Sequence, residues 1–296
     1  MNQLKESVKA VLRRVSPTFW LWLAELSMNP GERRQWDRRI QDALACPDNS
    51  RLKRVPDAGR IVGGCQIMHN GLRVLTDGYY GHRVTRMLKL NRGCHEPQEE
   101  VVFDAILPCL PPGAVMIEVG AYWAFYSMWM QKVVKGGRSF LIEPSAGSLE
   151  VGRANFKLNG FTGDFTHAYV GEKPGLDKDG TPVVSIGSFV EQHRLARIHL
   201  LHADIQGAEM DMLRGSDSLL RSQRIDYLFI STHSEPLHDE CALFLQDRRY
   251  RVLVSISLQE SYCWDGVLVA CGPHIEPPAF PHPSRKPRRE PEPVTA

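Results

Sequence analysis

The sequence lacks the features that mark several common classes of protein. Its 296 residues include only seven cysteines, which are scattered and form no C-x-x-C pair. This spacing argues against a disulfide framework or a structural zinc site and favours buried free thiols in a reducing compartment. No apolar run near the start is long enough to cross a bilayer, since the longest covers only residues 19–24 and precedes no small-residue cleavage site. We therefore expect a cytoplasmic protein.

Net charge is also nearly absent, because 36 Lys and Arg face 34 Asp and Glu, which leaves a net charge of +2. This balance argues against a dedicated nucleic-acid-binding protein, whose basic excess normally shows in the totals. The charge is unevenly distributed, however. Residues 1–54 hold 11 basic and 6 acidic side chains, residues 55–272 carry a net charge of −4, and residues 273–296 carry +1. A basic front end thus precedes a mildly acidic body.

The two ends of the chain differ from its body. Apolar residues at helical spacing predict one helix over residues 3–14 and a second from about Pro30 to Ala45. We expect a solvated face for the arginines of the second helix, with an anionic partner or a membrane surface as the alternative. These arginines are Arg33, Arg34, Arg38 and Arg39. Eight of the 20 prolines fall in residues 273–296, where apolar side chains are almost absent, so a disordered tail is expected.

Between these ends, short apolar strands alternate with helices. Residues 61–76 first predict a β-hairpin, because Asn70-Gly71 is a strong tight-turn signal between two apolar runs. Seven strands are predicted at residues 114–119, 139–143, 165–170, 199–204, 227–231, 251–256 and 267–271. Helices are predicted at residues 123–134, 148–158, 186–193, 209–220 and 236–248. This order predicts an α/β fold with a mostly parallel sheet, and the missing helix between the last two strands predicts an antiparallel pair at its edge.

Ligands of such sheets bind beyond the carboxyl ends of the strands, so the residues there carry the functional prediction. The first strand ends near Glu118 and Gly120, where a small residue lets a ligand approach the backbone beside a helix N-terminus. The second strand ends at Glu143, which can accept both hydroxyls of a ribose or, alternatively, only cap the next helix. The dinucleotide fingerprint G-x-G-x-x-G is absent. An adenosine-containing ligand with a charged amino group is therefore expected, and S-adenosylmethionine fits better than NAD.

Two later strands end in residues suited to proton transfer. Asp204 ends the fourth strand and His233 follows the fifth, so neighbouring strands would bring both into one crevice, where they could deprotonate an alcohol during methyl transfer. Alternatively, His233 is hydrogen-bonded within its own loop. We expect Glu209 only to stabilise the start of the next helix. A further alternative places a divalent cation among His202, Asp204, His233 and Glu235, although their spacing is not diagnostic.

Four local patterns resemble the FkbM-type family of S-adenosylmethionine-dependent O-methyltransferases, over roughly residues 95–258. They are HEPQE at residues 95–99, IEVGA at 117–121, IEP at 142–144 followed by Asn155 and Asn159, and DIQGAE at 204–209 followed by Leu213 and Gly215. His233 also fits a histidine that the family tends to carry after the fifth strand. The sequence departs from the family pattern at Glu118, Tyr122, Ala124 and Gln206, where Asp, Asn, Gly and Glu are usual. Alanine suits position 124 if its φ is negative.

The resemblance implies a Rossmann-like class I methyltransferase fold over residues 95–272, which binds S-adenosylmethionine. A helical extension (1–60) and a β-hairpin or lid region (61–94) would precede it, and the proline-rich tail would follow it. The cofactor would lie against Glu118, Gly120, Ala121, Tyr122, Glu143, Ala168, Tyr169 and Asp204. Asp204 and His233 would face the reacting hydroxyl.

The resemblance further implies methyl transfer to a hydroxyl of a small-molecule or glycan acceptor: a sugar, a glycan or a secondary metabolite. Two alternatives remain open at this point. One is transfer to nitrogen or to a carboxylate, and the other is a cofactor-binding or interaction protein without catalysis, which the altered loop at Tyr122 and Ala124 motivates. The basic front end lies outside the resemblance and is free to contact the acceptor, a membrane surface or a partner.

Overall fold

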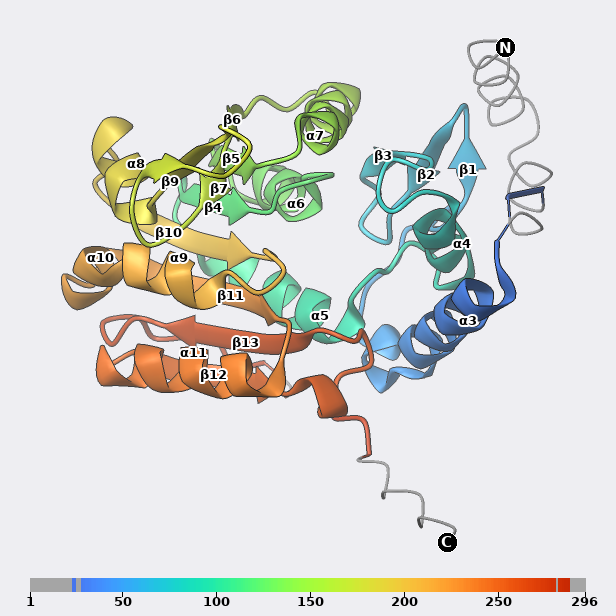
Figure 1. Cartoon of the computed structure of the whole chain (residues 1–296). Coiled ribbons are helices and arrows are strands. Elements are labelled where there is room, and N and C mark those ends of the chain that lie inside the picture. The colour runs from blue at the N-terminus through green and yellow to red at the C-terminus, as the bar shows by residue number, and fades with distance from the viewer. Residues whose placement is uncertain (1–22, 25–27, 281, 288–296) are drawn as a thin grey trace, which may run out of the picture.

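A computed structural model describes residues 23–24, 28–280 and 282–287; the helix predicted at residues 3–14 lies outside them. At its centre is a seven-stranded sheet with helices on both faces (Figure 1). The strand order is β12-β13-β11-β10-β4-β5-β6. These strands are β4 (Val115–Val119), β5 (Arg138–Glu143), β6 (Asp164–His167), β10 (Ile198–Ala203), β11 (Ile225–Thr232), β12 (Arg251–Ile256) and β13 (Gly266–Cys271).

The strand order creates a switch point beside β4. The chain runs outward from β4 through β5 to β6 and later returns to β10 on the other side of β4, and all these neighbours pair in parallel. Such a reversal defines the Rossmann-like arrangement, in which ligands bind beyond the carboxyl ends of the strands. The predicted class I methyltransferase fold is therefore confirmed. The antiparallel pair predicted at the edge is also present, as β12 and β13, and within it β13 is the strand that pairs antiparallel with β11.

Both faces of the sheet are buried, as expected for strands that are apolar throughout. Along β4, Met116 packs into one core, whereas Val115, Ile117 and Val119 pack into the other. The first face is covered by α5 (Pro97–Ile106), α6 (Phe125–Val133) and α7 (Ala146–Asn159). The second is covered by α8 (Ile186–Gln192), α9 (Glu209–Gly215), α10 (Asp217–Arg221) and α11 (Glu235–Asp247).

The residues before the sheet gather at one side of it (Figure 1). They form α3 (Pro30–Ala45), the short helix η1 (Pro47–Ser50), a small sheet and α4 (His82–Leu90). The α3 helix has its predicted bounds, because the Asn29 side chain accepts a hydrogen bond from the Glu32 N–H and Pro30 occupies the first turn. The predicted hairpin is present as β2 (Cys65–Ile67) and β3 (Arg73–Leu75), and β1 (Ile61–Val62) adds a third strand.

Several further elements of the structure differ from the sequence prediction. The strand predicted at residues 165–170 divides at Ala168 into β6 and β7 (Tyr169–Val170), and β7 joins a separate sheet. That sheet also contains β8 (Gly175–Leu176) and β9 (Pro182–Val184). Two short helices, η2 (Leu107–Cys109) and η3 (Leu258–Glu260), follow α5 and β12. The sequence analysis predicts neither α4 nor α5. The periodicity of α5 is hidden because this helix buries polar side chains as well as apolar ones.

The tail residues that the structure describes, 273–280 and 282–287, contact the body of the protein. The backbone N–H of Ser284 donates to the Asp48 carboxylate at 2.7 Å, and its carbonyl accepts from the Gln98 amide at 2.6 Å. Ile275 and Phe280, two of the few apolar residues there, pack against the main core. Prolines stiffen the unfolded chain, so that a small number of contacts offsets the lower entropy cost of ordering it.

The cysteine and membrane predictions can also be compared with the structure. All seven cysteines are free, as predicted, but Cys109 is exposed whereas the other six are buried. Among the described residues, we find no helix with the length and apolar character needed to cross a membrane.

Candidate functional site

A cavity of about 310 Å³ opens at the switch point, beyond the carboxyl ends of β4, β5 and β10. Its volume lies at the lower end of the range that small-molecule sites occupy, about 300–1,000 Å³. Six of the residues predicted to bind the cofactor line it: Gly120, Tyr122, Glu143, Ala168, Tyr169 and Asp204. The other two, Glu118 and Ala121, do not line it.

Gly120 sets the shape of this cavity. Its φ of +71° lies in the left-handed region, and a Cβ added there would lie 1.9 Å from the Asp204 carbonyl oxygen. The turn after β4 and the turn after β10 therefore touch backbone to backbone, and the Asp204 N–H also donates to the Val119 carbonyl at 3.0 Å. Only glycine fits this position.

Glu143 joins two loops at the opposite wall of the cavity. One carboxylate oxygen accepts from the Ser145 N–H at 2.8 Å and the other from the Tyr122 N–H at 3.1 Å. Each carboxylate oxygen has a second lone pair, so both could still accept a ligand hydroxyl. Burial raises the pKa of Glu143. Glu143 thus supports the start of α7, whose N-cap is Ser145, and also faces the cavity.

Glu118 occupies a different place from the predicted one. Its side chain is 3% exposed, and its carboxylate accepts from the Ser127 N–H at 2.9 Å, near the start of α6. Burial raises the pKa of this carboxyl group. Glu118 lies beside His202 in the parallel pairing of β4 with β10, so both side chains point to the same face of the sheet. This is the face that α5 and α6 cover. Glu118 therefore does not line this cavity, and its carboxylate instead supports the start of α6.

The loop after β4 is strained. Tyr122 has a φ of +34° and Ala124 a φ of +62°, so the condition under which alanine suits position 124 is not met. The family's usual Asn and Gly tolerate this region better than Tyr and Ala do. Packing compensates in part, because Tyr79 and Tyr80 lie 4.9 and 5.5 Å from the Tyr122 ring, and Tyr79 stacks on Trp123. Sequence reasoning missed this aromatic wall, which comes from the segment before α4.

His233 lies at the centre of a charged cluster beside the cavity. Its Nδ1 is 2.7 Å from Glu209 Oε1, and its Nε2 is 3.2 Å from Asp204 Oδ1 and 3.6 Å from Asp265 Oδ1. Burial lowers the pKa of His233, but hydrogen bonds to Asp204 and Glu209 and the charges of Asp204 and Asp265 outweigh burial and raise it to about 10. The structure therefore brings Asp204 and His233 together, but as an ion pair in which His233 is already protonated at neutral pH. A protonated imidazole cannot act as the base.

Glu209 and Asp265 complete this cluster. The fully buried Glu209 accepts the Gly207 N–H at 3.0 Å besides facing His233, so it does more than stabilise the start of a helix. Asp265, which precedes β13, lies 3.5 Å from Arg39 of α3. Burial raises the pKa of Asp265 to about 6, with repulsion from neighbouring carboxylates adding to this and Arg39 and His233 opposing it. No sequence signal pointed to Asp265, because its partners lie far away along the chain.

A layer of buried Glu–His pairs lies below the strand ends. It comes from the segment at residues 95–100, and its pairs are Glu96 with His95 at 3.1 Å, Glu99 with His202 at 2.7 Å, and Glu100 with His69 at 3.2 Å. Burial lowers the pKa of His202, but the Glu99 carboxylate outweighs burial and raises it. The HEPQE pattern therefore supports the site without lining the cavity.

The four residues of the alternative metal site are not brought together as a set, although Asp204 and His233 lie side by side. His202 faces Glu99 below the strand ends, and the Glu235 carboxylate accepts the Gln259 N–H at 2.9 Å. Among the described residues, no group of three or more His, Cys, Asp or Glu side chains is arranged to hold a metal ion.

Comparison with known proteins indicates which class of protein this chain resembles. The methyltransferase FkbM domain matches residues 173–252 of this chain. This range contains Asp204, Glu209 and His233 but begins after Gly120 and Glu143. The resemblance to FkbM-type methyltransferases is therefore confirmed over these residues, and it supports a methyltransferase. None of the curated proteins compared with the chain matches it.

Several solved structures are similar to this chain at low sequence identity. Precorrin-6y C5,15-methyltransferase from Geobacter metallireducens is 17% identical, covers 59% of this chain and 87% of its own, and has a TM-score of 0.41. TrmK from M. capricolum, in complex with S-adenosylhomocysteine, is 13% identical, with coverages of 57% and 69% and a TM-score of 0.40. Ribosomal protein L11 methylase from Lactobacillus delbrueckii subsp. bulgaricus is 12% identical, with coverages of 60% and 78% and a TM-score of 0.43.

Proposed function

We propose that this protein is an S-adenosylmethionine-dependent O-methyltransferase. The observation that carries the proposal is the cavity at the switch point, lined by Gly120, Glu143 and Asp204, in a chain that matches the FkbM methyltransferase domain. The donor set suits this cofactor. Glu143 faces the cavity as an acceptor for ribose hydroxyls, Ala168 adds an apolar wall for adenine, and Asp204 places negative charge near a cationic sulfonium.

The chain's own residues would then orient the reactants and move one proton. Bound S-adenosylmethionine supplies an electrophilic methyl group, and catalysis consists mainly of aligning the acceptor oxygen with it. His233 stays protonated and fixes the Asp204 carboxylate at 3.2 Å. Asp265 accepts the proton of the acceptor hydroxyl, because its pKa of about 6 leaves the carboxylate available at neutral pH.

The acceptor of this reaction is proposed to be a sugar, a glycan or another hydroxylated small molecule. This part rests on the FkbM resemblance and on the proton-accepting carboxylate beside the cavity. A protein that binds the cofactor without catalysis is the competing interpretation, and the strained loop at Tyr122 and Ala124 motivates it. Cofactor binding followed by a methyl-transfer assay separates the two.

Calorimetric titration with S-adenosylhomocysteine tests the cofactor site. We expect the wild type to bind with a dissociation constant below about 1 mM, and Glu143→Ala to bind at least about tenfold more weakly, because a charge-assisted hydrogen bond to the ribose is lost. Glu150→Ala is the matched control, since Glu150 lies on α7 with its side chain 74% exposed. Undetectable binding to the folded wild type, or equal affinities for the Glu143 and Glu150 variants, would refute the proposed site.

A further inference from the structure

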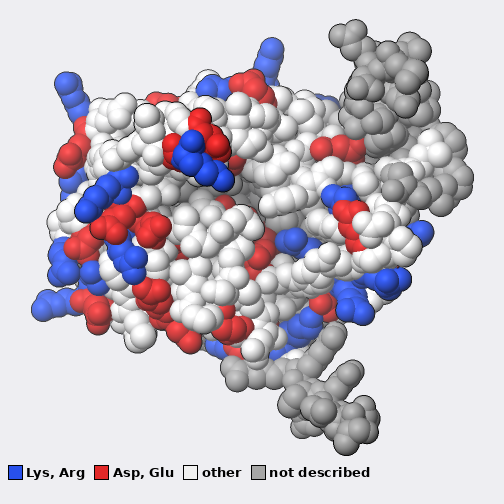
Figure 2. Space-filling model, viewed as in Figure 1, with Lys and Arg blue, Asp and Glu red and all other residues white. Residues whose placement is uncertain are grey.

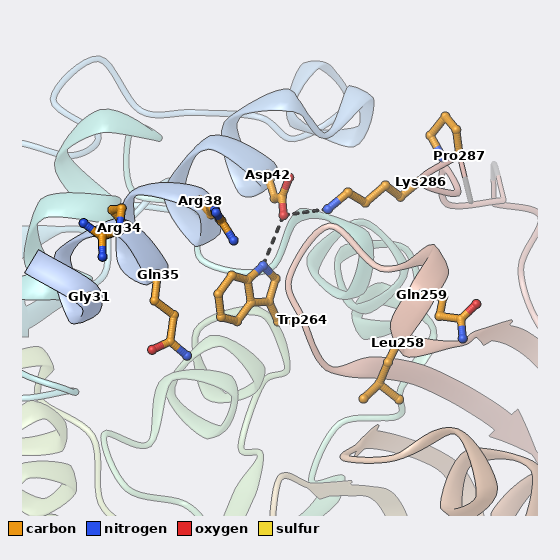
Figure 3. A pocket seen from close by; sticks show the side chains of 10 residues that line it. All are labelled: Gly31, Arg34, Gln35, Arg38, Asp42, Leu258, Gln259, Trp264, Lys286 and Pro287. Carbon is orange, nitrogen blue, oxygen red and sulfur yellow. Dashed lines mark hydrogen bonds and ion pairs between the residues drawn. The ribbon is translucent and has the colours of Figure 1, made fainter. Parts of the chain in front are cut away.

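A second cavity, of about 550 Å³, opens between α3 and the segment that joins β12 to β13 (Figure 3). Arg34, Gln35 and Arg38 line it from α3, and Trp264 lines it from the facing segment. We call this cavity the α3 groove. None of its lining residues belongs to the cofactor cavity, so the α3 groove is a separate hollow.

The α3 groove carries positive charge from Arg34 and Arg38. Arg34 and Arg38 are exposed, and neither forms an ion pair with any residue that the structure describes. The carboxylate of Asp42 is already occupied, because the Trp264 indole N–H donates to it at 3.2 Å and Lys286 Nζ lies 2.5 Å away, as the dashed lines of Figure 3 mark. Lys and Arg side chains also gather over α3 on the face shown in Figure 2.

Trp264 is held in an unusual backbone conformation. Its φ is +78°, in the left-handed region that a bulky side chain rarely adopts. The indole hydrogen bond to Asp42 fixes the ring against α3, and the Arg39 guanidinium lies 5.9 Å from the ring centre. Strained backbone of this kind concentrates at sites that hold ligands.

Trp264 also connects the α3 groove to the charged cluster. The next residue, Asp265, lies 3.6 Å from His233 Nε2, which in turn lies 3.2 Å from Asp204 at the edge of the cofactor cavity. Arg39, one position after Arg38 on α3, reaches Asp265 at 3.5 Å. A ligand that extends beyond Trp264 would therefore meet the proposed proton acceptor.

We propose that the α3 groove binds the methyl acceptor through an anionic group, a carboxylate or a phosphate. Arg34 and Arg38 hold the anion, Trp264 supports the body of the molecule, and the reacting hydroxyl lies toward Asp265. Arginine suits this role because its planar donor fork matches both anions. The identity of this ligand as the acceptor rests on the proposed methyltransferase function, whereas anion binding itself does not.

A membrane surface is the competing partner for these arginines, and the structure favours it less. A helix that lies on a membrane needs a broad apolar face beside its basic one. Among the large apolar side chains of α3 that the structure describes, only that of Leu44 is exposed, and 41% of its surface is accessible. Arg34 and Arg38 instead line a hollow, which fits a small anion better than a flat surface.

Titration of the full-length ¹⁵N-labelled protein with glucuronate, glucose 6-phosphate and glucose, at constant ionic strength, tests the α3 groove. Trp264→Phe assigns the Trp264 indole NMR signal. We expect glucuronate or glucose 6-phosphate to shift this signal with saturation, and glucose to shift it far less. The Arg34→Gln/Arg38→Gln double variant should bind the anion at least about tenfold more weakly. Arg33→Gln, on the same helix but outside the groove lining, should bind it as the wild type does.

Three outcomes would overturn the inference: no shift with either anion, an equal shift with glucose, or a shift that survives the double variant. Sedimentation with phosphatidylserine-containing vesicles covers the competing partner. If the vesicles bind the wild type but not the double variant, and neither sugar anion shifts Trp264, the groove is a membrane contact and the inference is wrong. Titration with S-adenosylhomocysteine remains independent, so a failure of the proposed function is distinguishable from a failure of the groove.

Discussion

The two sides of the strand-end crevice are built in different ways. On the cofactor side, Gly120, Glu143 and Ala168 each lie at the end of a strand of one continuous segment, and their contacts are largely with backbone groups. On the acceptor side, Arg39, His233 and Asp265 come from distant parts of the chain, and charged side chains contact one another. Under the proposed function, local turns would shape the site for the cofactor, whereas long-range contacts between charged side chains would supply the proton transfer and select the acceptor.

The largest effect is expected on the cofactor side, from Gly120→Ala. The new Cβ would lie 1.9 Å from the Asp204 carbonyl oxygen, so the two turns must separate. Binding of S-adenosylhomocysteine should fall by more than about 100-fold, and the melting temperature should fall as well. Gly113→Ala is the control, because its φ is also positive, at +76°, but no atom lies near the added Cβ. Equal stability and affinity for the two variants would show that the backbone contact does not shape the site.

Asp265→Asn should slow methyl transfer by about 10²- to 10⁴-fold, because an amide cannot accept the acceptor's proton. Affinity for S-adenosylhomocysteine should stay within about twofold of the wild type, since Asp265 does not line the cofactor cavity. The measurement follows transfer of labelled methyl groups from S-adenosylmethionine to sugar acids and sugar phosphates. Asp239→Asn, an exposed position on α11, serves as the control. Unchanged turnover in Asp265→Asn would show that a group other than Asp265 accepts the proton.

The charge of His233 predicts a pH dependence of stability. Folding raises its pKa from 6.5 to about 10, so the folded state binds more protons than the unfolded state between these values. The stabilisation from His233 should therefore be complete below about pH 6.5 and disappear as the pH rises to about 10. Urea unfolding of the wild type and His233→Gln at pH 6, 8 and 10 measures the difference. A difference in free energy that stays constant over this range would contradict a protonated His233.

The smallest effect is expected from Ala124→Gly, which relieves the positive φ of +62° in the loop after β4. A left-handed conformation costs a residue with a Cβ about 1–2 kcal/mol. Glycine avoids this cost, but it also raises the entropy of the unfolded chain, which offsets part of the stabilisation. The free energy of unfolding should rise by up to about 1 kcal/mol, as measured by urea unfolding. A clear loss of stability would show that packing of the Ala124 methyl group outweighs the backbone strain.

The fold could be predicted because its signals are local. The seven strands are short apolar runs and most of the helices are periodic, so their positions were right to within a few residues. The α5 helix was missed because Gln98, Glu99 and Glu100 are buried there, which removes the usual contrast between apolar and polar faces. The tail contact between Ser284 and Asp48 could not be predicted, because composition does not show which distant residues meet.

The candidate site could be predicted only where neighbouring turns define it. Gly120 and Glu143 were found because strand ends converge at the switch point of any such sheet. The protonation state of His233 could not be found, because it depends on Asp204 and Glu209 from the turn after β10 and on Asp265 from a segment far along the chain. Arg39 was expected on a solvated face, yet it points to Asp265, more than 200 positions away along the chain.

A crystal structure of the protein with S-adenosylhomocysteine would test the central claim most directly. The account predicts that the ligand lies beyond β4 and β5, with both ribose hydroxyls within about 3 Å of the Glu143 carboxylate. The adenine should pack near Ala168, and the sulfur should face Asp204 and the His233 cluster. A ligand bound elsewhere, or a ribose that makes no contact with Glu143, would contradict the proposed cofactor site.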